Sequence, residues 1–115
     1  MTSVGNDLIK QVFDLLQQFN YNVKTEGHTD NSSIRIEQFP SNWELSAARA
    51  AEVARELVEA GSSPTQLSVE GFSQYRPKMP NYSRQARATN RRIEIVCQRG
   101  SVRKLMVDVL RRNSR

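Results

Sequence analysis

Apolar residues recur at intervals of three and four over residues 7–19, and this spacing predicts an amphipathic helix. Over residues 21–25, apolar and polar residues alternate instead, which predicts a strand that ends at Gly27. Residues 31–40 are expected to form a loop, because Pro40 stops any earlier helix. The chain is therefore expected to begin with a helix, a strand and a loop.

A second helix is predicted to begin just after Ser41 and to run to about Ala60. Ser41 and Glu44 form a capping-box pattern at its start, and Gly61 is a natural stop at its end. One face of this helix is expected to pack against the core. Its apolar stripe consists of Trp43, Ala47, Ala50, Val53, Ala54, Leu57 and Val58.

The second half of the chain predicts two more strands, at residues 67–71 and 90–97. Residues 73–89 contain two prolines and many polar groups, so an irregular basic loop is expected there. Apolar residues at helical spacing after Gly100 predict a last helix over residues 101–113. Because a helix separates the first two strands, the order favours a crossover unit with parallel pairing. We expect an α/β fold in a single domain over residues 1–115.

The composition is that of an ordinary water-soluble domain, with 115 residues, 37% hydrophobic and 25% charged. No apolar run approaches the roughly 20 residues that span a bilayer, and no signal-peptide pattern opens the chain. We therefore expect that this chain crosses no membrane by itself. Its single cysteine, Cys97, excludes an internal disulfide and is expected to be a buried thiol.

The charge is uneven along the chain, although the net charge is only +5. Most of the seventeen Lys and Arg residues lie from Arg76 onward, where only Glu94 and Asp108 are acidic. A basic surface favours anionic partners, so a nucleic-acid-binding α/β domain is the alternative interpretation of this half. Phosphate contacts would make the affinity of such a domain fall steeply with salt.

A candidate binding site is indicated by one fixed anion and one fixed cation. Asp30 follows the first strand, and Arg49 lies in the second predicted helix, seven residues after Asn42 and so on nearly the same line. A carboxylate and a held guanidinium together suit a zwitterion, such as the free end of an amino acid. On residue types alone, a structural salt bridge between Asp30 and Arg49 is favoured over a ligand site, because ion pairs are more common than sites.

Catalytic and metal chemistry find little support in the sequence. His28 is the only histidine, and one histidine with one cysteine does not build an ordinary zinc site. A nucleophilic pair of Cys97 and His28 is conceivable, but Cys97 lies within a predicted strand without an activating motif. No nucleophile, base and oxyanion group occur together. We expect no enzyme activity, no metal and no cofactor.

Four segments, in this order, resemble the OmpA-like peptidoglycan-binding domain. They are Gly-His-Thr-Asp at 27–30, Leu-Ser-x-x-Arg-Ala at 45–50, Val-Glu-Gly-Phe at 69–72 and Asn-Arg-Arg-Ile-Glu-Ile at 90–95. The resemblance covers about residues 8–98. It implies a βαβαβ-type α/β sandwich, with a mixed sheet and helices packed on one face, no enzymatic activity and a periplasmic location. The predicted helix at 101–113 lies outside this shared core.

The resemblance also implies a ligand and the residues that bind it. Residues matching Asp30 and Arg49 hold the amino-acid end of diaminopimelate in the peptidoglycan stem peptide. Further matching positions line the same pocket or lie near it, and these are Thr29, Asn42, Leu45 and Arg92.

Within that family, the 31–40 loop and the Ser-Asn-Trp-Glu-Leu sequence at 41–45 are most similar to the flagellar motor stator B subunit (MotB/PomB type). That likeness implies a cell-wall anchor that forms a homodimer. It implies a stator A subunit as partner, bound through a transmembrane part that this chain does not contain. We therefore expect the periplasmic domain of a protein anchored in the inner membrane, with peptidoglycan and not nucleic acid as its ligand.

Overall fold

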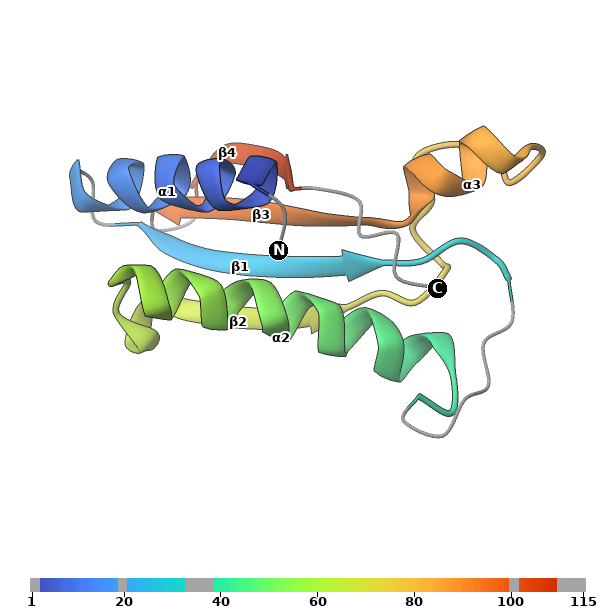
Figure 1. The fold of residues 1–115 in the computed structure, drawn as a ribbon, viewed down its shortest axis with the longest axis horizontal. Helices are drawn as coiled ribbons and strands as arrows, with labels where there is room; N and C mark the ends of the chain where they lie inside the picture. Colours follow the sequence, from blue (N-terminus) through green and yellow to red (C-terminus); the bar gives the residue numbers. More distant parts are fainter. Residues whose placement is uncertain (1–2, 19–20, 33–38, 100–101, 110–115) are drawn as a thin grey trace.

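The computed structural model describes residues 3–18, 21–32, 39–99 and 102–109, and Figure 1 shows its fold. A short 3₁₀ turn, η1 (Pro64–Gln66), precedes the second strand. The helices and strands follow in the order α1 (Ser3–Gln18), β1 (Asn22–His28), α2 (Asn42–Ala60), β2 (Leu67–Gly71), α3 (Arg84–Asn90), β3 (Arg92–Arg99) and β4 (Val102–Val109). Among the described residues, no helix is both long enough and apolar enough to span a bilayer.

The described strands form one mixed sheet in the order β2-β1-β3-β4. β1 pairs in parallel with β2, with Thr25 opposite Val69, and α2 makes the crossover between them. On its other side β1 pairs antiparallel with β3, with Thr25 opposite Ile95. The predicted parallel crossover and the predicted mixed sheet are therefore confirmed, and β1 has a neighbour on each side.

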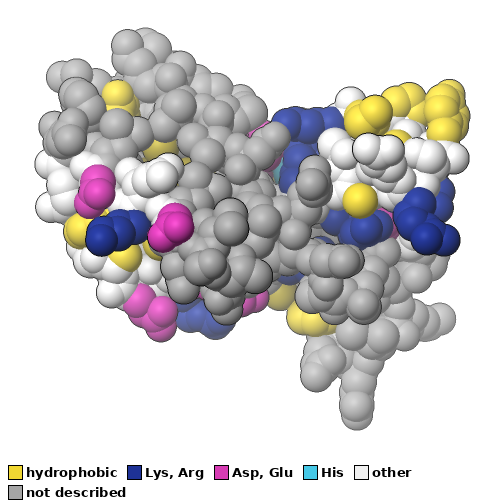
Figure 2. All heavy atoms as spheres, turned by 45° about the horizontal axis from the view of Figure 1, so that its top comes forward, with side chains coloured by type: hydrophobic (Ala, Val, Ile, Leu, Met, Phe, Trp, Pro, Cys, Tyr) yellow, Lys and Arg dark blue, Asp and Glu magenta, His cyan; other side chains and the backbone are white. Residues whose placement is uncertain are grey.

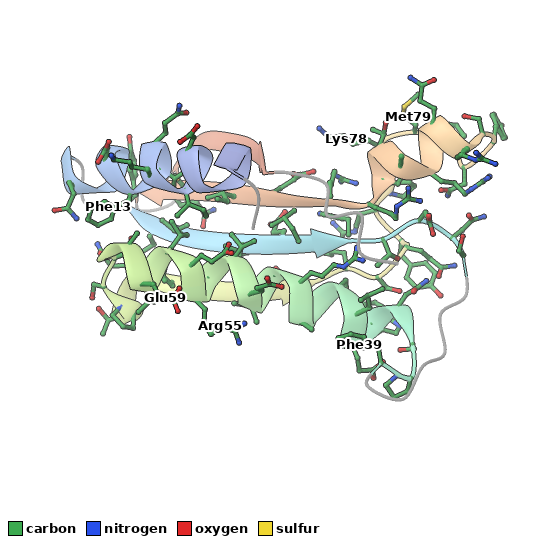
Figure 3. The ribbon with its side chains drawn as sticks, in the orientation of Figure 1. Phe13, Phe39, Arg55, Glu59, Lys78 and Met79 are labelled. Carbon is green, nitrogen blue, oxygen red and sulfur yellow. The ribbon has the colours of Figure 1, made fainter. Side chains whose placement is uncertain are left out.

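Helices α1 and α2 cover the same face of the sheet, because alternate residues of β1 and β3 pack against both of them. Arg55 and Glu59 are exposed side chains of α2, and Figure 3 labels both along this helix. The core between the helices and the sheet consists of Ile9, Val12, Val23, Val53, Leu57, Ile93, Ile95 and Cys97. This arrangement agrees with the expectation of helices on one face.

The predicted last helix at 101–113 is wrong, because residues 102–109 form strand β4. β4 pairs antiparallel with β3 along the edge of the sheet, with Ile95 opposite Val107. Without β4, the backbone N–H and C=O groups along the outer edge of β3 would lack strand partners, and β4 supplies them. The β-branched residues Val102, Val107 and Val109 also favour a strand. Residues 110–113 of the predicted helix lie outside the described residues.

The predicted irregular loop at 73–89 is also partly wrong, since α3 begins at Arg84 within it. The side chain of Ser83 caps this helix by accepting a hydrogen bond from the backbone N–H of Ala86. Within α3 only Ala86 and Asn90 are buried, so the sequence has no apolar stripe that would predict this helix. As a consequence β3 starts at Arg92 and not at residue 90.

Helix α2 has the predicted bounds and caps, but its buried face is rotated from the predicted stripe. Ser41 accepts a hydrogen bond from the backbone of Trp43 at 3.2 Å, and Gly61 ends the helix with a φ of 119°. Trp43 is 53% exposed and Val58 is also exposed, against expectation. The buried positions of the first turns are instead polar or mixed, and they include Asn42, Leu45, Ser46 and Arg49.

Two glycines let α2 lie directly against the strands. A Cβ atom on Gly27 of β1 would lie 2.0 Å from the backbone oxygen of Ser46. A Cβ atom on Gly71 of β2 would lie 2.7 Å from the backbone nitrogen of Ala47. Close to this contact, the Thr25 hydroxyl donates a hydrogen bond to the Ala50 carbonyl at 2.8 Å. The helix backbone thus approaches the strand backbones closely, with only the small Ser46 and Thr25 side chains at the contact.

We predict that Gly27→Ala destabilises the fold by about 1–3 kcal/mol, because the new methyl group meets helix backbone that has no room to move. Urea unfolding followed by circular dichroism measures the loss. Ser68→Thr, which adds a methyl group at an exposed position of β2, is the control and should change stability by less than about 0.5 kcal/mol. Equal stability of Gly27→Ala and the natural chain would show that α2 does not lie this close to β1.

Candidate functional site

Asp30 lies just beyond the end of β1 and is 1% exposed. Its Oδ1 accepts a hydrogen bond from the backbone N–H of Ser32 at 2.9 Å, and its Oδ2 pairs with a guanidinium nitrogen of Arg91 at 2.5 Å. The carboxylate is therefore held in one position with a cation beside it. This ion pair of Asp30 with Arg91 was not predicted from the sequence.

Thr29 helps to fix the loop after β2 beside Asp30. Its backbone N–H donates to the carbonyl of Ser73 at 2.9 Å, and its hydroxyl donates to the carbonyl of Asp30 at 2.9 Å. One residue earlier, the carbonyl of Gly27 accepts a hydrogen bond from the backbone of Phe72 at 3.0 Å. The chain segments that follow the parallel strands β1 and β2 are thus joined at the same edge of the sheet.

Asn42 connects three segments around the site. Its amide nitrogen donates to the carbonyl of Ser32 at 2.8 Å and to the side chain of Gln74 at 3.1 Å. A longer contact of 3.5 Å reaches the carbonyl of Asp30. Among the described residues its Oδ1 is buried and accepts no hydrogen bond. Since a buried acceptor without a donor costs about 1–3 kcal/mol, this oxygen suits an N–H donor supplied by a ligand.

Leu45 and Arg49 lie on the same buried face of α2 as Asn42, and Arg49 is 6% exposed. Seven residues bring the helix back to nearly the same direction, and long helical side chains lean toward the N-terminus of their helix. Arg49 and Asn42 therefore lie on the same side of α2. The role of Arg49 as a ligand-binding residue stays a prediction.

Arg91 is placed by the short helix α3 and by the buried side chain of Asn90. Arg91 is the C-cap of α3, and its N–H donates to the carbonyl of Arg87 at 3.1 Å. The Asn90 amide donates to the carbonyl of Met79 at 2.8 Å and accepts from the backbone of Lys78 at 2.9 Å. The segment before α3 is fastened to its last residue in this way, which holds Arg91 next to Asp30. Sequence reasoning missed this arginine.

Arg92, which the resemblance placed near the pocket, makes its contacts elsewhere. It lies opposite His28 in the β1–β3 pairing, and its guanidinium pairs with Glu94 at 2.5 Å and donates to the carbonyl of Arg76 at 3.0 Å. It lines a cavity of about 380 Å³ with side chains of β1 and β3 that point away from the helices. The structure thus brings together Asp30, Thr29 and the α2 residues, and it puts Arg92 in a second polar group.

That second group contains three ligand atoms from Glu26, His28 and Glu94 that lie within 4.8 Å of one another. Glu26 and Glu94 are direct neighbours across β1 and β3, and the His28 ring stacks on Phe72 at 5.1 Å. Carboxylate and imidazole ligands suit a divalent cation. However, Arg92 already pairs with Glu94, so a cation would compete with a basic side chain that is in place. We interpret the group as a charge-balanced network.

The conceivable nucleophilic pair of Cys97 and His28 does not form. Cys97 lies opposite Val23 and belongs to the core under the helices, whereas His28 belongs to the polar group on the other face of the sheet. Burial raises the pKa of the Cys97 thiol, which disfavours the reactive thiolate. These positions agree with the expected inert, buried thiol.

The family of this chain follows from its similarity to known proteins. A model described as the OmpA family matches residues 3–91. The chain belongs to the OmpA family. Among curated proteins, this OmpA-family chain is 36% identical over 93 residues to the uncharacterized protein YtxE of Bacillus subtilis (strain 168). The match covers 80% of the chain and 38% of YtxE, so the chain spans well under half of that relative.

Solved structures give the same result for the fold of this OmpA-family domain. The periplasmic domain of Helicobacter pylori MotB superposes with a TM-score of 0.75 at 29% identity, over 82% of the chain and 61% of that structure. The cell wall anchor of the T6SS from Pseudomonas aeruginosa superposes with a TM-score of 0.72 at 39% identity, over 78% of the chain and 63% of that structure. The predicted resemblance to MotB periplasmic domains is confirmed.

We predict that Cys97 reacts with a thiol reagent at least about a hundredfold more slowly in the folded OmpA-family domain than in urea. Burial raises the pKa of this thiol, so the folded protein holds little thiolate at pH values where a free cysteine already reacts. Absorbance of a disulfide-exchange reagent at pH 8 measures both rates. Similar rates with and without urea would place Cys97 at the surface and would contradict the described core.

Proposed function

We propose that this OmpA-family domain is a non-catalytic peptidoglycan-binding module that anchors a MotB-type stator complex to the cell wall. One observation carries the proposal. A buried carboxylate, Asp30, is held in place beside the first turn of α2, whose buried face presents Asn42 and Arg49. Rigid charges of both signs at one place suit a ligand that carries an ammonium and a carboxylate together.

The proposed ligand is the free amino-acid end of diaminopimelate in the stem peptide. Its ammonium group would donate to Asp30 and to the buried Oδ1 of Asn42, which accepts no hydrogen bond from the described residues. Its carboxylate would be held by the paired donors of Arg49. Leu45, buried between these two helix positions, offers an apolar surface to the methylene chain of the ligand. Thr29 keeps the backbone at Asp30 in place.

Arg91 has a separate part in this proposal. In the described structure it balances the charge of Asp30, so the buried carboxylate is not left without a cation. Each carboxylate oxygen can accept more than one hydrogen bond, and Arg91 and Ser32 contact one oxygen each. In this proposal the ammonium group of the ligand binds Asp30 in addition to Arg91.

The likeness to the MotB periplasmic domain and to the T6SS cell wall anchor supports the proposed wall-anchoring role. On the same ground we propose a periplasmic location and a homodimer. In a longer protein, a transmembrane helix would join the domain to the inner membrane and to a stator A subunit. Many weak wall contacts would then act together, because linked sites bind with high avidity.

We predict that Asp30→Asn and Arg49→Ala each lower binding to purified peptidoglycan sacculi by about tenfold or more, since each removes a charged partner from a buried ligand contact. Co-sedimentation at physiological salt measures the bound fraction. Arg55→Ala is the matched control, because it removes one positive charge from the outer side of the same helix (Figure 3). If both site variants pellet with sacculi to the same extent as the natural chain, the assignment of the pocket to Asp30 and Arg49 is disproved.

Nonspecific adhesion through basic side chains has a different signature. Lys and Arg side chains gather at the α3 end of the molecule, to the right in Figure 2, whereas Asp and Glu side chains are more frequent at the other end. The exposed or half-buried basic residues of this region include Arg76, Lys78, Arg84 and Arg87. Binding through them would survive Arg49→Ala and would vanish as salt rises.

We further predict that the ligand carboxylate is recognised by Arg49. A soluble stem peptide that ends in lysine keeps the ammonium group of diaminopimelate but lacks its second carboxylate. The natural chain should bind the diaminopimelate peptide about tenfold more tightly than the lysine peptide, and Arg49→Ala should bind the two alike. Isothermal titration calorimetry measures all four affinities. A preference that Arg49→Ala retains would mean that another group holds the carboxylate.

A further inference from the structure

Two large aromatic side chains lie side by side on the surface next to the candidate site. Trp43 is 53% exposed and Tyr75 is 62% exposed, and their ring centroids are 5.5 Å apart with the planes tilted by 32°. Aromatic side chains usually bury most of their area, and contiguous exposed apolar surface commonly marks an interaction site. Neither ring is used by the pocket proposed for the stem peptide.

Hydrogen bonds hold the backbones that carry the two rings in place. The Ser46 hydroxyl accepts from the backbone N–H of Ser73 at 3.0 Å and donates to the carbonyl of Trp43 at 3.0 Å. Asn42 donates to Gln74, the residue before Tyr75, at 3.1 Å. The loop after β2 is therefore fastened to the first turn of α2 from both sides of the aromatic pair.

The same loop takes an unusual backbone conformation to present the tyrosine. Ser73 has a φ of 57°, in the left-handed region that non-glycine residues seldom adopt. The Tyr75 N–H donates to the carbonyl of Phe72 at 3.2 Å, which closes the turn. A strained turn persists only where its surroundings hold it, and here the Ser46 and Asn42 contacts do so. The position of Tyr75 beside Trp43 is therefore specified by the fold.

We propose that Trp43 and Tyr75 form a stacking platform for a sugar ring of the peptidoglycan glycan strand. This inference rests on the proposed function and adds a second part of the same ligand. Pyranose rings carry an apolar C–H face that packs on aromatic rings while their hydroxyl groups remain in water. Such a ligand suits a pair of exposed rings whose sequence neighbours, Glu44 and Arg76, are exposed and charged.

The aromatic pair lies next to the proposed stem-peptide pocket, and this position favours a sugar ring as its ligand. Asn42 and Gln74, which meet beside Asp30, each come directly before one of the two aromatic residues. A stem peptide is covalently attached to a sugar, so a peptide seated at Asp30 brings the glycan close to the surface beside the pocket. A large apolar protein partner or a bilayer would need a wider apolar surface than two rings flanked by charges.

The test compares two soluble ligands, the free diaminopimelate-containing stem peptide and the same peptide attached to its disaccharide. The natural chain should bind the disaccharide form about tenfold more tightly, a size that ordinary aromatic stacking allows. Trp43→Ala and Tyr75→Ala should each remove most of this preference while leaving the affinity for the free peptide within about twofold. Tyr82→Ala, which removes an aromatic ring that is 89% exposed, is the control and should change neither affinity.

A direct readout is available because Trp43 is the only tryptophan in the chain. Its fluorescence should change when the disaccharide form binds and should change much less with the free peptide. Circular dichroism confirms that each variant is folded.

The outcomes separate the two proposals. If the natural chain binds both ligands equally, the platform is disproved and the stem-peptide pocket stands. If it binds neither ligand, the proposed function fails and the platform fails with it. If Trp43→Ala or Tyr75→Ala loses affinity for the free peptide as well, the residue shapes the pocket and the sugar assignment is overturned.

Discussion

The contact of the α2 backbone with the backbones of β1 and β2 determines where everything else lies. Gly27 and Gly71 have no Cβ atom, and backbone and hydroxyl atoms of Ser46 and Ala47 lie where those Cβ atoms would be. The hydrogen bond from Thr25 to Ala50 then fixes how far along the strand the helix lies. With the helix so placed, its first turn reaches the edge of the sheet where β1 and β2 both end. The polar residues Asn42 and Arg49 of the first turns are buried there, and this is where the candidate site lies.

The fold was predicted best where the deciding signals are local. Ser41 and Gly61 gave the bounds of α2, because a cap and a left-handed stop act on neighbouring backbone groups. Strand β4 was missed because its conformation depends on β3, which offers an open edge that no window of the sequence reveals. Trp43 was assigned to the core on hydrophobicity alone, yet the helix face toward the sheet is set by close backbone packing, which favours small and polar residues there.

The candidate site was also predicted only as far as local sequence signals reach. Asp30 and Arg49 were identified from their places after a strand and within a helix, and both are buried. The pairing of Arg91 with Asp30 was not predictable, because Arg91 and Arg92 are adjacent in the sequence and yet pair with different carboxylates. The polar group on the open face of the sheet escaped notice as well. Its carboxylates come from different strands, and only the register of β1 against β3 makes them neighbours.

The position of β1 has a mechanical consequence. Five residue pairs join β1 to β2 on one side, and seven join it to β3 on the other. A ligand held at Asp30, just beyond the end of β1, would pull along the axis of that strand (Figure 1). Such a load strains both hydrogen-bond ladders in shear, so many bonds resist it together, whereas a load across the strands would open them one by one. For the proposed wall anchor, this bracing would lie along the direction of tension.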